Sequence, residues 1–254
     1  MPTQAYNLLW LSPPRQSKRV VSSVPFDTPI PPKTVETMLR NAQSNPTAEV
    51  RLWVDSQLHT EVQMSWLRQM TASCKNGNFS LHDLRSIDEY NRPSLSSRSD
   101  TTGTWRTIKH SLIWQQVDAA KLLVCLQGDY DQVFYSDADT TIDINSEEIQ
   151  RSLSEYGLAV GGSFDKLNNF RGIENQAFGF NRTRIGFFAN LYYETIRYID
   201  IMRRNENGFK TYVDELLKLM HGDTRAIAVH TEHDGTSVLP PDEEIKPHGP
   251  GWIS

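Results

Sequence analysis

The sequence predicts an α/β domain with a mostly parallel central sheet and helices on both sides. Short apolar segments, rich in β-branched and aromatic residues, alternate along the chain with longer segments whose apolar residues recur at helical spacing. The expected strand at 5–11, the helix at 32–44 and the strand at 49–55 form a strand, helix, strand opening of this kind. The helix stops at Asn45-Pro46, because the residue before a proline is biased away from helical backbone.

The later segments continue the alternation. The polar, turn-rich stretch 94–103 predicts a loop, and 146–157 predicts a helix with a serine cap, acidic residues in its first turn and a glycine stop. The other expected elements are helices at 105–127, 184–204 and 209–220, and strands at 131–136, 158–162, 175–181 and 225–232.

Composition narrows the class of protein. The 254 residues fit one domain with a sizeable core, and 38% hydrophobic with 22% charged residues is globular composition. The net charge of −5 disfavours nucleic acid as the main partner. The two cysteines, Cys74 and Cys125, are too few for a disulfide framework. No stretch approaches the roughly 20 apolar residues of a membrane span, so we expect no transmembrane segment and a cytoplasmic location.

A pair of carboxylates stands where a buried strand should end. In YDQVFYSDADTTIDI (130–144), an apolar run leads into Asp137 and Asp139. Ligands of open α/β sheets bind beyond the carboxyl ends of the strands, so this is a natural place for a functional site. Mg²⁺ or Mn²⁺ accepts one or two carboxylates and completes its shell with water and substrate phosphates. The pair therefore predicts a site for a metal-bound diphosphate.

Two other chemistries use a similar pattern. A phosphatase of the haloacid dehalogenase type has an apolar strand followed by Asp-x-Asp-x-Thr, which Asp137, Asp139 and Thr141 match, although that motif normally follows the first strand of its domain. A non-enzymatic calcium-binding module is the third reading. Its EF-hand-like loop would take ligands at Asp137, Asp139, Thr141, Asp143, Asn145 and Glu148, but Ile142 stands where the sharp turn needs glycine.

Segments along the whole chain, taken in order, resemble retaining glycosyltransferases of the GT-A fold that have an Asp-x-Asp sugar-binding region. These segments are YNLLWLS (6–12), NPTAEVRLWVDS (45–56), VDAAKLLVCLQGDYDQVFYSDADT (117–140), GIENQAFGFN (172–181) and IKPHGPGWIS (245–254). The group includes yeast-type initiating mannosyltransferases, the large clostridial glucosylating toxins and bacterial effectors. The stretch 130–140 is also similar to the glycogenin-like galactosyl- and glucosyltransferases.

The resemblance implies roles for residues before the aspartates. Trp10 matches the tryptophan that stacks on the uracil base, and Asp55 is placed near the nucleotide. Asp118 and Lys121 match an aspartate and an arginine that hold the sugar hydroxyls, and their i, i+3 spacing puts them on one helical face. Lysine lacks the bidentate fork of arginine, which leaves the sugar open, and an ordinary surface salt bridge is the structural alternative.

The resemblance also implies roles after the aspartates. Glu174 and Asn175 match an acidic-asparagine pair near the anomeric carbon, where they would orient the acceptor or stabilise a cationic sugar. In the tail, Trp252 would close the donor site, and His248 or Ser254 would be the third metal ligand beside Asp137 and Asp139.

The resulting expectation is one GT-A (Rossmann-like) catalytic domain over 1–254, with 240–254 as a C-terminal lid. It would be a hexosyltransferase that uses Mn²⁺ or Mg²⁺ and moves a hexose or N-acetylhexosamine from a UDP-sugar to a protein or glycan, with retention of configuration. Asp139 would bind the metal directly, and Asp137 would contact the ribose or reach the metal through water. Analogy with the effectors adds secretion without a classical signal peptide to the possible locations.

Overall fold

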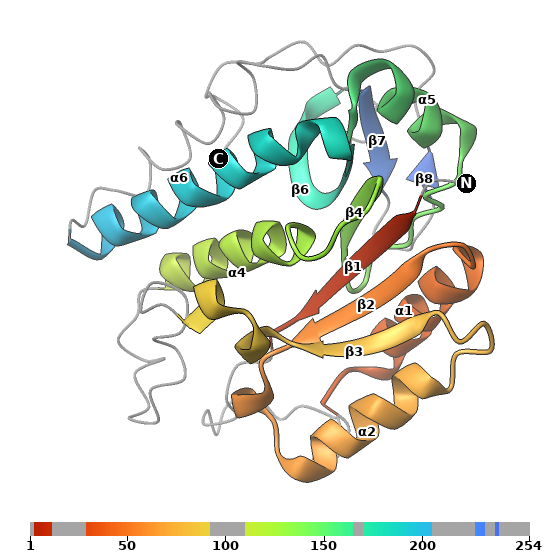
Figure 1. The fold of residues 1–254 in the computed structure, drawn as a ribbon, viewed down its shortest axis with the longest axis vertical. Helices are drawn as coiled ribbons and strands as arrows, with labels where there is room; N and C mark the ends of the chain where they lie inside the picture. Colours follow the sequence, from red (N-terminus) through yellow and green to blue (C-terminus); the bar gives the residue numbers. More distant parts are fainter. Residues whose placement is uncertain are drawn as a thin grey trace.

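The chain forms an eight-stranded mixed sheet with helices on both faces, in a computed structural model that describes residues 3–11, 29–91, 110–164, 170–204, 227–231 and 237–238 (Figure 1). The sheet order is β3-β2-β1-β4-β6-β5-β7-β8. The strands are β1 (Gln4–Trp10), β2 (Glu49–Val54), β3 (Phe79–Asp83), β4 (Gln132–Asp137), β5 (Leu158–Phe164), β6 (Phe170–Asn181), β7 (Ile227–Thr231) and β8 (Ser237–Val238). The α/β class with a mostly parallel sheet is confirmed.

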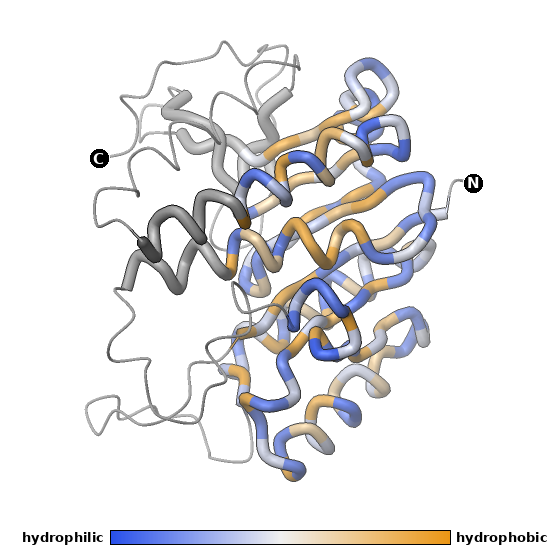
Figure 2. The backbone as a smooth tube through the Cα atoms, turned by 60° about the vertical axis from the view of Figure 1, so that its left-hand side comes forward, coloured by the Kyte–Doolittle hydropathy of each residue, from blue (hydrophilic) through white to orange (hydrophobic). Residues whose placement is uncertain are grey.

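Five α-helices cover the sheet in the described part of the chain. They are α1 (Pro32–Ser44), α2 (Glu61–Ala72), α4 (His110–Cys125), α5 (Glu147–Tyr156) and α6 (Ile185–Arg204). One buried cluster joins α1, α2 and α5 to one face of the sheet, and a second joins α4 and α6 to the other. Figure 2 shows the hydrophobic stretches running along the central strands, as expected for parallel strands that are buried on both faces.

Local sequence signals set several element ends. Ser146 caps α5 by accepting a hydrogen bond from the Ile149 amide, and Gly157 ends it with a φ of +72°, the left-handed backbone that glycine adopts without a steric penalty. Both features were predicted. The strand expected at 175–181 is the end of the longer β6, which runs antiparallel to β4 and β5. The antiparallel β6 is compatible with the expected, mostly parallel sheet.

The segment between β2 and α4 contains two elements that the sequence analysis missed. They are α2 and β3, and β3 extends the parallel sheet at one edge. The Thr60 side chain accepts from the Gln63 amide while the Gln63 side chain accepts from the Thr60 amide, so a capping box starts α2. This Thr-x-x-Gln signal was visible in the sequence.

Some expectations fall outside the described residues. These are the loop at 94–103, the start of the helix at 105–109, the helix at 209–220 and the proposed lid at 240–254. None of the helices in the described part of the chain is long and apolar enough to cross a membrane.

Candidate active site

The site lies where the strand order reverses. β1 pairs in parallel with β2 on one side and with β4 on the other. The chain continues from β1 to β2 and β3 on the first side, and then crosses back to place β4 on the second side. Such a switch point opens a crevice beyond the carboxyl ends of the strands, where α/β proteins bind ligands. Leu9 of β1 is paired with Asp137 of β4, and Trp10 is the next residue along β1. The sheet register therefore brings the predicted tryptophan and the first aspartate to the same edge.

A tight turn carries the two carboxylates. The Thr140 amide donates to the Asp137 carbonyl at 3.0 Å, which closes a four-residue turn. Ala138 and Thr140 are buried, while Asp139 is exposed and the Asp137 side chain is 35% exposed. Among the described residues, no hydrogen bond or ion pair engages the Asp139 carboxylate. Asp139 is thus a free carboxylate held on a well-anchored turn.

Asp137 already has partners within the protein. Lys121 of α4 places its Nζ 2.9 Å from Asp137 Oδ1 and 3.7 Å from Asp118 Oδ1. The Lys121 side chain is only 8% exposed, so it points into the site edge and not into solvent. The i, i+3 pair on α4 is therefore present, and it extends to the first aspartate as a chain of alternating charges. This geometry makes Asp137 a partly neutralised carboxylate.

Tyr135 is a member of the site that the sequence analysis missed. It is fully buried, stacks on Phe178 with ring centroids 5.3 Å apart, and donates its hydroxyl proton to Asp137 Oδ1 at 2.9 Å. Burial, and then the adjacent Asp137 charge, raise the pKa of Tyr135 well above its ordinary value. The hydroxyl therefore stays a donor. The signal was the two-residue period of a strand, which puts residues 135 and 137 on the same face.

Trp10 ends β1 with an unused polar group. Its side chain is partly exposed and packs against the cluster on the α1 and α2 face. The indole Nε1 is buried and has no hydrogen-bond partner among the residues that the structure describes. A buried donor without a partner is uncommon and calls for an explanation. The placement fits the predicted stacking role, which stays a prediction.

Asp55 does not fit a place at the nucleotide. Its buried carboxylate accepts from Arg85 Nε and Nη2, both at 2.8 Å, from the Tyr90 hydroxyl at 2.9 Å and from the Gln57 amide at 3.0 Å. With these protein donors on its two oxygens, it holds the segment after β3 against the end of β2. We assign Asp55 a structural role.

The remaining predicted residues are placed only in part. Glu174 lies on β6 opposite Gly161 of β5. Because β6 is antiparallel to β4 and pairs Ala177 with Ser136, Glu174 and Asn175 extend toward the edge where Asp137 lies. Trp252, His248 and Ser254 lie outside the described residues.

The carboxylates fit a cation that is shared with a ligand. Within the described residues, no group of three or more His, Cys, Asp or Glu side chains could hold a metal ion. Two carboxylates suffice for Mg²⁺ or Mn²⁺ when phosphate and water oxygens complete the shell. Because Lys121 and Tyr135 occupy Asp137 Oδ1, Asp139 is the better direct ligand.

The geometry of the segment does not favour the calcium-loop alternative. Among the described residues, its carboxylates do not form a group of three that could hold a metal ion. The segment also follows a strand, β4, and not a helix, and Ile142 and Ile144 are buried in the core.

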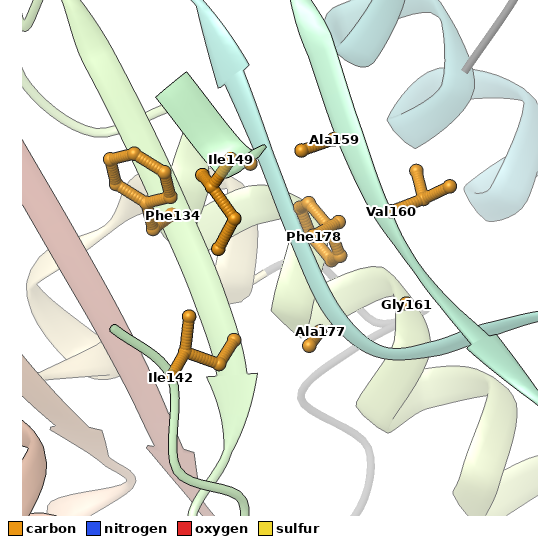
Figure 3. Close-up of a pocket in the computed structure, with 9 residues that line it drawn as sticks. Phe134, Ile142, Ile149, Ala159, Val160, Gly161, Ala177 and Phe178 are labelled. Carbon is orange, nitrogen blue, oxygen red and sulfur yellow. The ribbon is translucent and has the colours of Figure 1, made fainter. Parts of the chain in front are cut away.

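A hollow beside β4, β5 and β6 has the wrong chemistry for the site. It occupies about 250 Å³, including its opening, and Figure 3 shows its lining from β4, β5, β6, α5 and Ile142 of the segment after the turn. The lining side chains that Figure 3 labels, such as Phe134, Ile149 and Phe178, are all apolar. A phosphate or a metal ion would find no ligand there, so the hollow is a feature of core packing.

Comparisons with known proteins add similarities of architecture. No protein-family model and no curated protein matches the chain. One similar solved structure is described as PaToxG glycosyltransferase (TM-score 0.48, 13% identity, 86% of this chain and 70% of that chain). Another is the glycosyltransferase GlyE of Streptococcus pneumoniae TIGR4 in its apo form (TM-score 0.46, 14% identity, 89% of this chain and 45% of that chain).

A third similar structure is a putative nucleotide-diphospho-sugar transferase from Desulfovibrio desulfuricans G20 (TM-score 0.41, 12% identity, 91% of this chain and 80% of that chain). With identities of 12–14% and TM-scores below 0.5, these similarities assign neither a family nor an activity.

The Tyr135 contact predicts a change in the pH dependence of stability. Near pH 8, Tyr135→Phe should lower the free energy of unfolding by about 1 kcal/mol, because one hydrogen bond is lost. Above the ordinary tyrosine pKa of 10.0, the unfolded wild type loses a proton that the folded state keeps, so rising pH favours unfolding. The variant lacks this effect, and the difference should shrink by about 1.4 kcal/mol per pH unit.

Urea unfolding of both proteins from pH 8 to 11 measures this difference. Tyr6 and Cys125, whose pKa values are also raised by burial, are present in both proteins and cancel. Two curves that stay parallel through pH 10 would show that Tyr135 ionises normally and is not buried against Asp137.

Proposed function

We propose that the chain is a glycosyltransferase that transfers a hexose or N-acetylhexosamine from a UDP-sugar, with Mn²⁺ or Mg²⁺ as cofactor. The observation that carries this proposal is the pair Asp137 and Asp139 on a fixed turn at the switch point, beside Trp10 and the buried Lys121. At this sheet edge, a carboxylate suits the metal ion, a cationic side chain suits the negatively charged diphosphate, and an aromatic side chain suits the base.

Each residue has a distinct role in the proposal. Asp139 holds the metal, which neutralises charge on the leaving diphosphate. Asp137, fixed by Tyr135 and Lys121, contacts the ribose or reaches the metal through water. Trp10 stacks on the uracil through the exposed part of its side chain.

The sugar lies between α4 and the start of the long strand β6 in this proposal. Asp118 and Lys121 bind sugar hydroxyls, and Lys121 does so from a position already fixed by Asp137. Glu174 and Asn175 face the acceptor. Trp252 closes the site, and His248 or Ser254 completes the metal shell.

The transfer needs no covalent intermediate. The bond between the anomeric carbon and the β-phosphate oxygen breaks while the acceptor oxygen bonds to the same face of the sugar. The acceptor proton passes to the departing phosphate, so UDP leaves and configuration is retained. The proposal assigns no carboxylate as a covalent nucleophile. The acceptor is a protein or a glycan, and the protein acts in a cytoplasm or as a secreted effector.

Replacement of Asp139 tests the metal role. Asp139→Asn should lower kcat/KM for donor hydrolysis by at least about 100-fold, because charge on the leaving group loses its stabilisation. Asp143→Asn is the matched control, since Asp143 is exposed in the same segment and its Oδ1 only accepts from the Asn145 amide, which asparagine can also do. The control should keep activity within about twofold of the wild type.

Thermal stability with ligands separates this proposal from its rivals. UDP and Mn²⁺ together should raise Tm more than either alone, because each completes the site of the other. A shift with Ca²⁺ alone, or hydrolysis of a phosphomonoester that depends on Asp137, would contradict the transferase and favour a calcium module or a phosphatase.

Replacement of Trp10 tests the stacking role. Aromatic stacking on a base is worth about 1–3 kcal/mol by alanine substitution, so Trp10→Ala should weaken UDP binding roughly 5- to 150-fold. Trp10→Phe keeps a ring and should lose much less. Calorimetric titration with UDP in the presence of Mn²⁺ measures both. Equal affinity in Trp10→Ala and the wild type would place the uracil elsewhere.

A further inference from the structure

Two buried asparagines, Asn41 on α1 and Asn45 at its C-terminal cap, hold the segment that follows the aspartate turn. Asn41 Nδ2 donates to the Thr140 carbonyl at 2.8 Å, and the Ile142 amide donates to Asn41 Oδ1 at 3.2 Å. One helical turn later, Asn45 Nδ2 donates to the Ile142 carbonyl at 2.9 Å, and the Ile144 amide donates to Asn45 Oδ1 at 3.0 Å. Each side-chain amide therefore takes the place of a peptide group in a neighbouring strand.

The spacing of the two amides explains the fit. Residues four apart on an α-helix are separated by a rise of about 6 Å. Residues two apart in an extended chain are separated by about 6.6 Å. An Asn-x-x-x-Asn pair over the last turn and the C-cap of a helix can thus satisfy alternate peptide groups of an extended segment. The segment 140–144 has no partner strand on this side among the described residues, and the asparagines supply its hydrogen bonds.

Packing alone does not account for asparagine at these positions. Both side chains are fully buried, and Asn41 shares the inward face of α1 with Met38 and Ala42. An apolar residue would fill such a position without the cost of removing an amide from water. The amides are kept where they hydrogen-bond the chain directly after Asp139.

The hydrogen bonds of Thr140 fix segment 140–144 relative to the aspartate turn. The Thr140 carbonyl that Asn41 binds also accepts from Ser136 Oγ at 3.3 Å, and the Thr140 amide closes the turn onto Asp137. Ser136 Oγ lies 2.6 Å from the Tyr6 hydroxyl of β1. Thr140 is thus fixed from α1 on one side and from β1 and β4 on the other, and Asp139 is its chain neighbour.

We propose that Asn41 and Asn45 are positioning residues that set the metal affinity of Asp139 by fixing the exit of its turn. The inference rests on the proposed function, since it concerns the same metal site. Neither asparagine contacts the ligand. Outer-shell groups of this kind typically change metal affinity by about 10- to 100-fold when they are removed.

The test compares Asn41→Ala with a control that also damages α1. Asn78 donates to the carbonyls of Ala42, Asn45 and Ala48 at the end of the same helix but does not touch residues 137–144. Both Asn41→Ala and Asn78→Ala should lower Tm. In calorimetric titrations of Mn²⁺ with UDP present, Asn41→Ala should raise the Mn²⁺ Kd about tenfold or more. Asn78→Ala should leave it within about twofold of the wild type.

The outcomes separate this inference from the proposed function. If the wild type does not bind Mn²⁺ in the presence of UDP, the proposed function and the positioning role are both overturned. If it binds and the two variants bind equally well, or weaken equally, the positioning role alone is overturned.

A measurement on the wild type covers the case in which Asn41→Ala does not fold. Hydrogen exchange at the Ile142 and Ile144 amides should slow when UDP and Mn²⁺ are added, because ligand bound at Asp139 stabilises the anchored exit. Unchanged exchange at these amides, in protein shown to bind the ligands, would overturn the proposal.

Discussion

The pairing of β1 with β4 is the constraint on which the site depends. It places β4 on the side of β1 opposite to β2, so that the strand order reverses at β1. It also aligns Leu9 with Asp137. This register brings Trp10 to the same sheet edge as the aspartate turn, with its side chain on the α1 and α2 face. It places Asp137 where Lys121 approaches from α4, which packs behind both strands. A shift of one residue would turn the side chains of β4 to the opposite faces, so that Asp137 and Tyr135 would move together away from Lys121 on α4.

The two aspartates differ in their surroundings. The Asp137 carboxylate faces the buried Lys121 ammonium and the Tyr135 hydroxyl, which hold it in place. Asp139 is exposed and has no partner among the described residues, so its oxygens are available to a cation. The local order comes from three directions: Tyr135 on the strand, Lys121 on one face of the sheet, and Asn41 on the other. The carboxylates are therefore positioned before any ligand arrives, which reduces the ordering cost of binding.

The features that were predicted correctly from the sequence have local causes. Alternation of apolar segments predicted the α/β class, and the Ser146 cap and Gly157 stop predicted the ends of α5. The carboxylates were found because they directly follow a strand, and the Asp118 and Lys121 pair was found by helical spacing. The antiparallel direction of β6 was not predictable, because a strand's own residues do not encode the direction of its neighbour. The roles of Asn41 and Asn45 depend on partners about a hundred residues away, and only the fold brings them together.

The central claim is that Asp139 holds a metal ion that a nucleoside diphosphate shares. A crystal of the protein grown with UDP and Mn²⁺ tests it most directly, because manganese has an anomalous signal that locates the ion without ambiguity. The account predicts an anomalous peak bonded to an Asp139 oxygen and to the diphosphate, with the uracil against Trp10. A peak away from Asp139, or UDP bound elsewhere on the protein, would contradict it.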